Sequence, residues 1–174
     1  MPRIRYQVAA SLDGYIAGPN DETDWIIMDP EIDFEALFAQ FDTFIMGRKT
    51  FEVTGGGGGP TASEVRTFVF SRTLRQQDFP NVTIVSEVSA RSVAPIRDHS
   101  VKDIWLFGGG TLFRSFLDAG LVDTVEIAVM PVLLGEGVSL LPAPADRANL
   151  TLTGHRVYSS GIVSVEYTVS PPAA

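Results

Sequence analysis

The sequence lacks cysteine altogether and contains only two histidines among its 174 residues. The absence of cysteine excludes disulfides, zinc–thiolate sites and thiol catalysis, and no His/Asp/Glu spacing indicates another metal site. No apolar run approaches the ~18 residues that a membrane helix needs, and residues 1–18 lack the apolar core of a signal peptide. We therefore expect a cytoplasmic protein that does not associate with membranes.

Positive charge is also in short supply. The chain has 13 Lys and Arg against 21 Asp and Glu, which gives a net charge of −8. This balance argues against general affinity for DNA, RNA or anionic membranes. It leaves room for one anionic ligand, because binding a phosphate needs only a few local donors. The expected partner is therefore a small molecule.

Short apolar stretches bounded by turn residues indicate a globular α/β protein. With 45% hydrophobic residues and no visible linker, residues 1–174 are expected to form one domain with a sizeable core. The alternation in residues 3–10 predicts a strand. Apolar residues at helical spacing predict helices over 32–41, with Phe34, Leu37, Phe38 and Phe41 in the core, and over 111–119. Further strands are expected at 43–46, 67–70, 82–85, 104–107 and 123–130.

Two further segments complete the expected fold. Residues 87–98 are weakly helical, but Pro95 is expected to break or start a helix there. Residues 150–169 are expected to form a hairpin around residues 159–161. The whole pattern is typical of a mostly parallel central sheet flanked by helices, with an antiparallel C-terminal hairpin. The five glycines 55–59 are expected to form a mobile loop, with a substrate lid as the alternative.

A strand that runs directly into three glycines and a helix is the strongest local feature. The apolar stretch 104–107 precedes Gly108, Gly109 and Gly110, and Thr111 begins the helix. Glycines allow a ligand to approach the backbone closely, and a helix N-terminus attracts phosphate. Ligands of open α/β sheets bind beyond the carboxyl ends of the strands. The pattern is not G-x-G-x-x-G, so an ordinary strand–helix turn stays open as the alternative.

Two other strand ends carry groups that suit phosphate oxygens. Residues 46–50 read Met-Gly-Arg-Lys-Thr, and residues 70–73 read Phe-Ser-Arg-Thr. Each combines a guanidinium group with hydroxyl donors, although either taken alone is more simply a solvated surface segment. Three such strand ends in one small domain favour a phosphate-containing ligand.

The order of these segments resembles that of the dihydrofolate reductase-like superfamily. Residues 44–52 (FIMGRKTFE) and 106–110 (LFGGG) are similar to its cofactor-binding turns. Residues 11–17 (SLDGYIA) and 131–137 (PVLLGEG) are closer to the C-terminal reductase domain of the bifunctional deaminase-reductases of riboflavin biosynthesis. The resemblance covers residues 3–169.

The resemblance implies a nicotinamide dinucleotide and the residues that contact it. Ala9 and Ile16 would flank the nicotinamide. Ser71 and Arg72 would hold a 2′-phosphate, which favours NADPH over NADH. The remaining implied contacts, on the adenosine and pyrophosphate side, are Gly47, Arg48, Lys49, Thr50, Gly108, Gly109, Gly110, Thr111 and Leu112. A cis peptide bond is implied between Gly108 and Gly109.

The resemblance also implies a substrate site near the first helix. Trp25 corresponds to the family's tryptophan near the substrate, and the catalytic acid is Glu31, Asp33 or neither. Both carboxylates suit a helix N-terminus equally well, because the helix dipole favours negative charge there. True dihydrofolate reduction is therefore not the preferred hypothesis.

The preferred hypothesis is an NADPH-dependent reductase of a small heterocycle, either pterin-like or ribosylamino-pyrimidine-like. The alternatives are a genuine dihydrofolate reductase, a dinucleotide-binding module without turnover, and a purely structural dimer module. A homodimer is expected, because the sister reductases commonly dimerise and the apolar segment 129–141 offers surface near the sheet edge.

Overall fold

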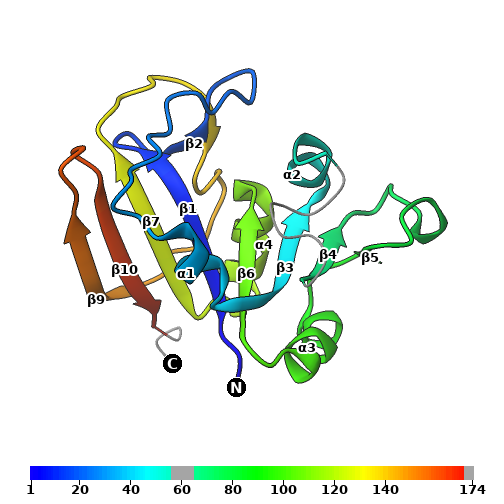
Figure 1. Ribbon diagram of the computed structural model, residues 1–174. Helices are drawn as coiled ribbons and strands as arrows, with labels where there is room; N and C mark the ends of the chain where they lie inside the picture. Colours follow the sequence, from blue (N-terminus) through cyan, green and yellow to red (C-terminus); the bar gives the residue numbers. More distant parts are fainter. Residues whose placement is uncertain (56–64, 171–174) are drawn as a thin grey trace.

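The central feature of the structure is one sheet of eight strands in the order β5-β4-β3-β6-β1-β7-β10-β9 (Figure 1). The computed structural model describes residues 1–55 and 65–170. The strands are β1 (Ile4–Ser11), β3 (Phe41–Gly47), β4 (Arg66–Phe70), β5 (Thr83–Val85), β6 (Asp103–Gly108), β7 (Thr124–Met130), β9 (Leu150–Val157) and β10 (Val163–Val169). A separate two-stranded sheet pairs β2 (Tyr15–Ala17) with β8 (Val138–Ser139).

Six of the eight strands are joined to one another by parallel pairing, and β10 is antiparallel to both of its neighbours, β7 and β9. The predicted fold class is therefore confirmed, including the C-terminal hairpin around residues 159–161. The carboxyl ends of the parallel strands point to the upper edge in Figure 1, where α2 (Arg48–Val53) lies and α4 (Gly110–Asp118) begins. This shared edge brings the phosphate-suited segments together.

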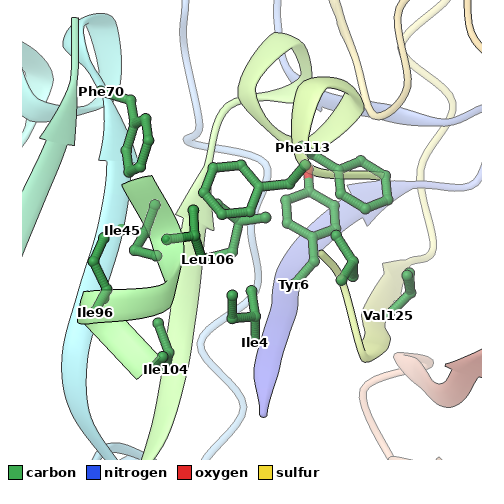
Figure 2. Close-up of a cluster of buried hydrophobic side chains, with 12 residues drawn as sticks. Ile4, Tyr6, Ile45, Phe70, Ile96, Ile104, Leu106, Phe113 and Val125 are labelled. Atoms are coloured by element: carbon green, nitrogen blue, oxygen red, sulfur yellow. The ribbon is translucent and has the colours of Figure 1, made fainter. Parts of the chain in front are cut away.

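One face of the sheet is covered by α3 (Ala90–His99) and α4. Val93 and Ile96 of α3 and Phe113 and Phe116 of α4 pack on the alternate residues of the strands. Figure 2 shows the centre of this cluster, where the ring of Tyr6 stacks on Phe113 with centroids 3.8 Å apart. This face is an apolar core that leaves no room for a ligand.

The other face carries α1 (Phe34–Phe38) and a smaller core centred on Trp105 of β6. On β1 and β7 this face presents polar residues, because Ile4 and Tyr6 use the opposite face for the core. The 3-10 helix η1 (Gln76–Asp78) connects β4 to β5 at the edge of this side. One face of the sheet therefore forms an apolar core, whereas the other presents polar residues on β1 and β7.

The helix predicted over residues 32–41 is wrong in length. It has only five residues, none of them buried, and Phe41 begins β3 instead. Phe41 is buried because its ring packs 5.0 Å from Trp105 and under the guanidinium of Arg5. Phe34, Leu37 and Phe38 are half-buried rather than core residues. Aromatic residues suit both helix and strand, and the contacts across the sheet decided between them.

Pro95 neither breaks nor starts a helix, which corrects the second expectation. Helix α3 runs through it, from a capping box between Ser89 and Ser92 to His99. The cap satisfies backbone donors at the start, and burial of Val93 and Ile96 outweighs the hydrogen bond that Pro95 cannot donate.

The segment 129–141 does not lie near the sheet edge. Its first two residues belong to β7, which is covered on both sides by β1 and β10, and the edge strand is β9. The position assumed for this segment in predicting a homodimer is therefore wrong, and the dimer itself stays a prediction.

None of the helices in residues 1–55 and 65–170 is long and apolar enough to cross a membrane. Of the five glycines 55–59, only Gly55 lies within the described residues.

Candidate functional site

A cleft of about 820 Å³ opens at the carboxyl ends of β3 and β6. We call it the upper compartment. It is lined by most of the residues expected to bind a dinucleotide, namely Ala9, Ile16, Gly47, Arg48, Lys49, Thr50, Gly108, Gly109, Gly110, Thr111 and Leu112. The parallel pairing of β3 with β6 brings these separate segments together, since Met46 lies opposite Gly108.

The three glycines of this compartment have different surroundings. Gly108 has a φ of +140°, a conformation that side chains rarely adopt, and its bond to Gly109 is cis, as the resemblance implied. A Cβ on Gly109 would lie 3.7 Å from Thr50 Oγ1, on the open side of the turn. A Cβ on Gly110 would instead collide with the carbonyl oxygen of Ser139. The turn therefore faces the cleft at Gly109 and is packed against the loop after β8 at Gly110.

The cationic residues that line the upper compartment belong to α2 and lie opposite the glycine turn. Arg48 and Lys49 are exposed, and within residues 1–55 and 65–170 Arg48 forms a 3.8 Å ion pair with Glu52, in which both side chains are about half exposed. An exposed pair of this kind contributes little to stability, so the guanidinium can reorient toward an anion at small cost. A helix N-terminus, a glycine turn and two cations form a setting that fits a dinucleotide pyrophosphate.

Ser71 and Arg72 follow β4 but do not line the cleft. Phe70, which precedes them, does line it and lies opposite Gly47. The Ser71 hydroxyl accepts hydrogen bonds from the backbone N–H groups of Thr73 and Leu74, at 3.2 and 3.1 Å, so it closes the turn. Arg72 is exposed beside the cleft. The structure thus places both residues outside the lining of the cleft, directly after Phe70 at its rim.

The wall that carries Ile16 is held by Asp13. Its carboxylate accepts hydrogen bonds from the Ser11 hydroxyl at 2.6 Å and from the backbone N–H groups of Gly135 and Leu134 at 2.7 and 3.1 Å. These bonds lower the pKa of Asp13 to about 2. The segments 11–17 and 131–137 that carried the resemblance are therefore in direct contact, and their contact shapes the cleft.

A second cavity of about 610 Å³, the lower compartment, continues from the first. The two share lining residues on β1 and β6 and on the loop before α1, among them Gln7, Ala9, Ile26, Phe34 and Trp105. It lies over the polar face of β1, β7 and β10, beside α1. A ligand in the upper compartment and one in the lower compartment would meet across Ala9.

The floor of the lower compartment is a row of polar residues from three neighbouring strands. Gln7 of β1 lies opposite Glu126 of β7, which lies opposite Glu166 of β10. Gln7 Oε1 is shielded from solvent and accepts no hydrogen bond from the described residues. Glu126 is 8% exposed, and both its oxygens accept from the Arg5 guanidinium at 2.7 Å. Burial by itself would lower the pKa of Arg5, but its bonds and attraction to Glu126 outweigh this and raise it.

Of the predicted catalytic residues, Glu31 and Asp33 line the lower compartment and Trp25 does not. Glu31 lines the lower compartment but accepts from the Ser159 hydroxyl at 2.6 Å and from Arg156 at 3.2 Å. Bonds from the Ser159 hydroxyl and N–H, helped by Arg156, lower the pKa of Glu31. Asp33 also lines this compartment, and its side chain caps α1 by accepting from Ala36 N at 2.9 Å. Trp25 donates to the Glu22 carbonyl and lines neither compartment.

Gln7, Glu126 and Glu166 are the site residues that sequence reasoning missed. Each is a polar residue inside a strand in which apolar residues predominate, and this was the available signal. The signal was ambiguous because an exposed strand face carries the same pattern. Only the strand order shows that the three form one row beneath a cavity.

Comparison with known proteins identifies the family. A family model described as the RibD C-terminal domain matches residues 2–164. The chain belongs to the RibD C-terminal domain family. The chain is also similar to the uncharacterized protein YyaP of Bacillus subtilis (strain 168). The two sequences are 37% identical over 95% of this chain and 94% of YyaP.

Solved structures confirm the fold of this family member. A riboflavin biosynthesis protein of Shewanella sp. PV-4 superposes with a TM-score of 0.82 and 25% identity, covering 98% of this chain and all of that one. A dihydrofolate reductase from Enterococcus faecalis complexed with NADP(H) superposes with a TM-score of 0.69 and 17% identity, covering 97% of each chain. The family match confirms the closer resemblance to the riboflavin group, and the structural match confirms the dihydrofolate reductase-like fold.

Proposed function

We propose that this chain is an NADPH-dependent reductase of a small nitrogen heterocycle, pterin-like or ribosylamino-pyrimidine-like. One observation carries the proposal: the upper and lower compartments lie side by side and share Ala9 in their linings. The upper compartment has the open glycine backbone and the cations that a dinucleotide needs. The lower compartment has the volume and the polar floor that a small heterocycle needs.

The residues of the chain would bind and orient the two reactants. Gly108, Gly109 and Thr111, with Arg48 and Lys49, would hold the phosphates, while Ala9 would lie between the nicotinamide and the substrate. The dinucleotide, when bound, supplies the hydride. Arg72 at the rim favours NADPH, because a guanidinium forms strong charge-assisted bonds with an additional phosphate.

Dihydrofolate is not the preferred substrate. A general acid works best when its pKa lies near the working pH, whereas the contacts of Glu31 lower its pKa and Asp33 caps a helix. Loss of general acid catalysis costs ~10²–10⁴-fold in rate. The same contacts favour a second candidate, a dinucleotide-binding module without turnover.

The decisive experiment combines binding and turnover. Titration with NADPH and NADH is expected to show binding of both, with NADPH tighter. NADPH oxidation is then followed with dihydrofolate and with aminopyrimidine ribosides and their phosphates. Binding without turnover of any substrate would favour the non-catalytic module. Turnover of dihydrofolate at ~1–10³ per second, abolished by Glu31→Gln or Asp33→Asn, would instead indicate a genuine dihydrofolate reductase.

A further inference from the structure

The two compartments differ in charge. The charged residues that line the upper compartment are two cations, Arg48 and Lys49, and one carboxylate, Asp21. The lower compartment is lined by the carboxylates of Glu31, Asp33, Glu126 and Glu166, and by a single guanidinium, that of Arg156. The imidazole of His155 also lines it. Even when Arg5 behind Glu126 and His155 are both counted with Arg156, the four carboxylates outnumber these groups by one. A ligand of the lower compartment meets a negative potential.

The floor of the lower compartment carries two acceptors to which no described side chain donates. They are Gln7 Oε1, which is shielded and accepts no bond within residues 1–55 and 65–170, and the Glu166 carboxylate. Neighbouring strands are ~4.8 Å apart, so the row from Gln7 through Glu126 to Glu166 spans about 10 Å. Because Gln7 Oε1 is closed off from solvent, the Gln7 amide has to turn toward the cavity before this oxygen can accept from a ligand N–H, and that bond would remove the cost of an acceptor without a donor.

The guanidinium that lines this compartment, that of Arg156, is already engaged. The Arg156 guanidinium pairs with Glu31 at 3.2 Å and lies 4.5 Å over the ring of Tyr158. A phosphate at Arg156 would displace Glu31 and leave that carboxylate without its cation beside the new anion. This arrangement disfavours phosphate binding there.

We propose that the substrate of the lower compartment is an amino-substituted nitrogen heterocycle, neutral or protonated, that carries no phosphate group. This inference rests on the proposed function and narrows it, because it selects unphosphorylated compounds from the two substrate classes. Ring and exocyclic N–H groups would donate to Gln7 and Glu166. Glu126, fixed by Arg5, would be the positioning residue between them.

Three probes test this at pH 7.5: 2,4-diaminopyrimidine, cytidine and cytidine 5′-monophosphate. Trp105 lines both compartments, so its fluorescence reports binding, and a Trp25→Phe background removes the only other tryptophan. The titrations are made with and without saturating NADPH. Failure to bind NADPH would contradict the proposed function, whereas the charge preference is measured on the cofactor-free protein as well.

We expect 2,4-diaminopyrimidine and cytidine to bind and the monophosphate to bind about fivefold more weakly than cytidine, the effect of ~1 kcal/mol between unit charges about 4 Å apart in water. Glu166→Gln should lower the affinity for 2,4-diaminopyrimidine and reduce the difference in affinity between cytidine and cytidine 5′-monophosphate. Gln7→Leu should weaken both unphosphorylated probes. The matched control Glu87→Gln removes one exposed carboxylate outside the lining of both compartments and should leave all ratios unchanged.

Three results would overturn the proposal. The first is an affinity for cytidine 5′-monophosphate that equals or exceeds the affinity for cytidine. If Arg156→Gln then abolished binding of the monophosphate, Arg156 would be assigned as a phosphate site. The second is unchanged affinity of every probe in both Gln7→Leu and Glu166→Gln, with folding verified by circular dichroism. The third is absence of binding by both unphosphorylated probes.

Discussion

The upper and lower compartments of the cleft are built by different means. The upper one uses backbone: a glycine turn, a helix N-terminus and short segments contiguous in sequence. The lower one uses side chains from β1, β7, β10 and the loop before α1, which are far apart in sequence. A dinucleotide phosphate is recognised by backbone N–H groups wherever it occurs, whereas a substrate is recognised by its particular donors and acceptors. We therefore expect the ligand of the upper compartment to be one that many proteins bind, and the ligand of the lower compartment to be particular to this chain.

The largest expected effect tests whether the floor of the lower compartment is also structural. Glu126→Leu should lower the free energy of unfolding by about 3–5 kcal/mol, because it leaves the buried Arg5 without its bidentate partner. Urea unfolding followed by circular dichroism measures this. The double variant Arg5→Met/Glu126→Leu should recover most of the loss, and a double variant as unstable as the single one would contradict the assignment.

Two neighbouring glycines separate folding from binding in the upper compartment. Gly110→Ala should destabilise the fold by ~1–3 kcal/mol, because its Cβ meets the carbonyl oxygen of Ser139. Gly109→Ala, which has 3.7 Å to Thr50 Oγ1, should keep its stability and lose at least tenfold in NADPH affinity. Thermal unfolding and NADPH titration of both variants check the pair. Unchanged NADPH affinity in folded Gly109→Ala would remove the glycine turn from the site.

Arg72 tests how far the upper compartment extends. Arg72→Ala should weaken NADPH about tenfold, ~1.4 kcal/mol, and leave NADH unchanged, because only NADPH carries the additional phosphate. Arg75→Ala is the matched control, since Arg75 is also exposed and lies three residues farther along the chain. Equal losses for NADPH and NADH would reject the role of Arg72 and leave the rest of the cleft intact.

Asp13 links the wall of the upper compartment to acid stability. Its pKa in the folded protein is about 2, below the ordinary value of 3.8. Its contribution to stability is therefore complete above pH ~4 and is lost as the pH falls through about 2. In Asp13→Asn, unfolding should vary less with pH in that window than in the parent protein, as measured by urea unfolding at stepwise pH. Asp146→Asn, an exposed control, should keep the parent profile.

The smallest expected effect concerns the opposite face of β1. Burial raises the pKa of Tyr6, whose hydroxyl has no hydrogen-bond partner among the described residues. Tyr6→Phe keeps the stack on Phe113 and should change the free energy of unfolding by no more than ~0.5 kcal/mol, or raise it slightly. Its NADPH affinity should equal that of the parent protein. A loss of 2 kcal/mol would show that the hydroxyl has a partner, such as a bound water.

The sequence by itself determined most of the strands, the glycine turn and the separate segments that line the upper compartment, because each of these depends on residues close together in the chain. Alternation in residues 3–10 and the three glycines after 104–107 are local patterns, and local patterns specify local structure. Tertiary structure decided the rest. Phe41 entered a strand, α3 passed through Pro95, and Glu31 paired with Ser159 and Arg156, because contacts between segments distant in the chain outweighed local preference. Asp33 instead caps α1 through a local bond, one of the alternatives that the sequence had left open. The row of Gln7, Glu126 and Glu166 exists only through the strand order, which no single segment encodes.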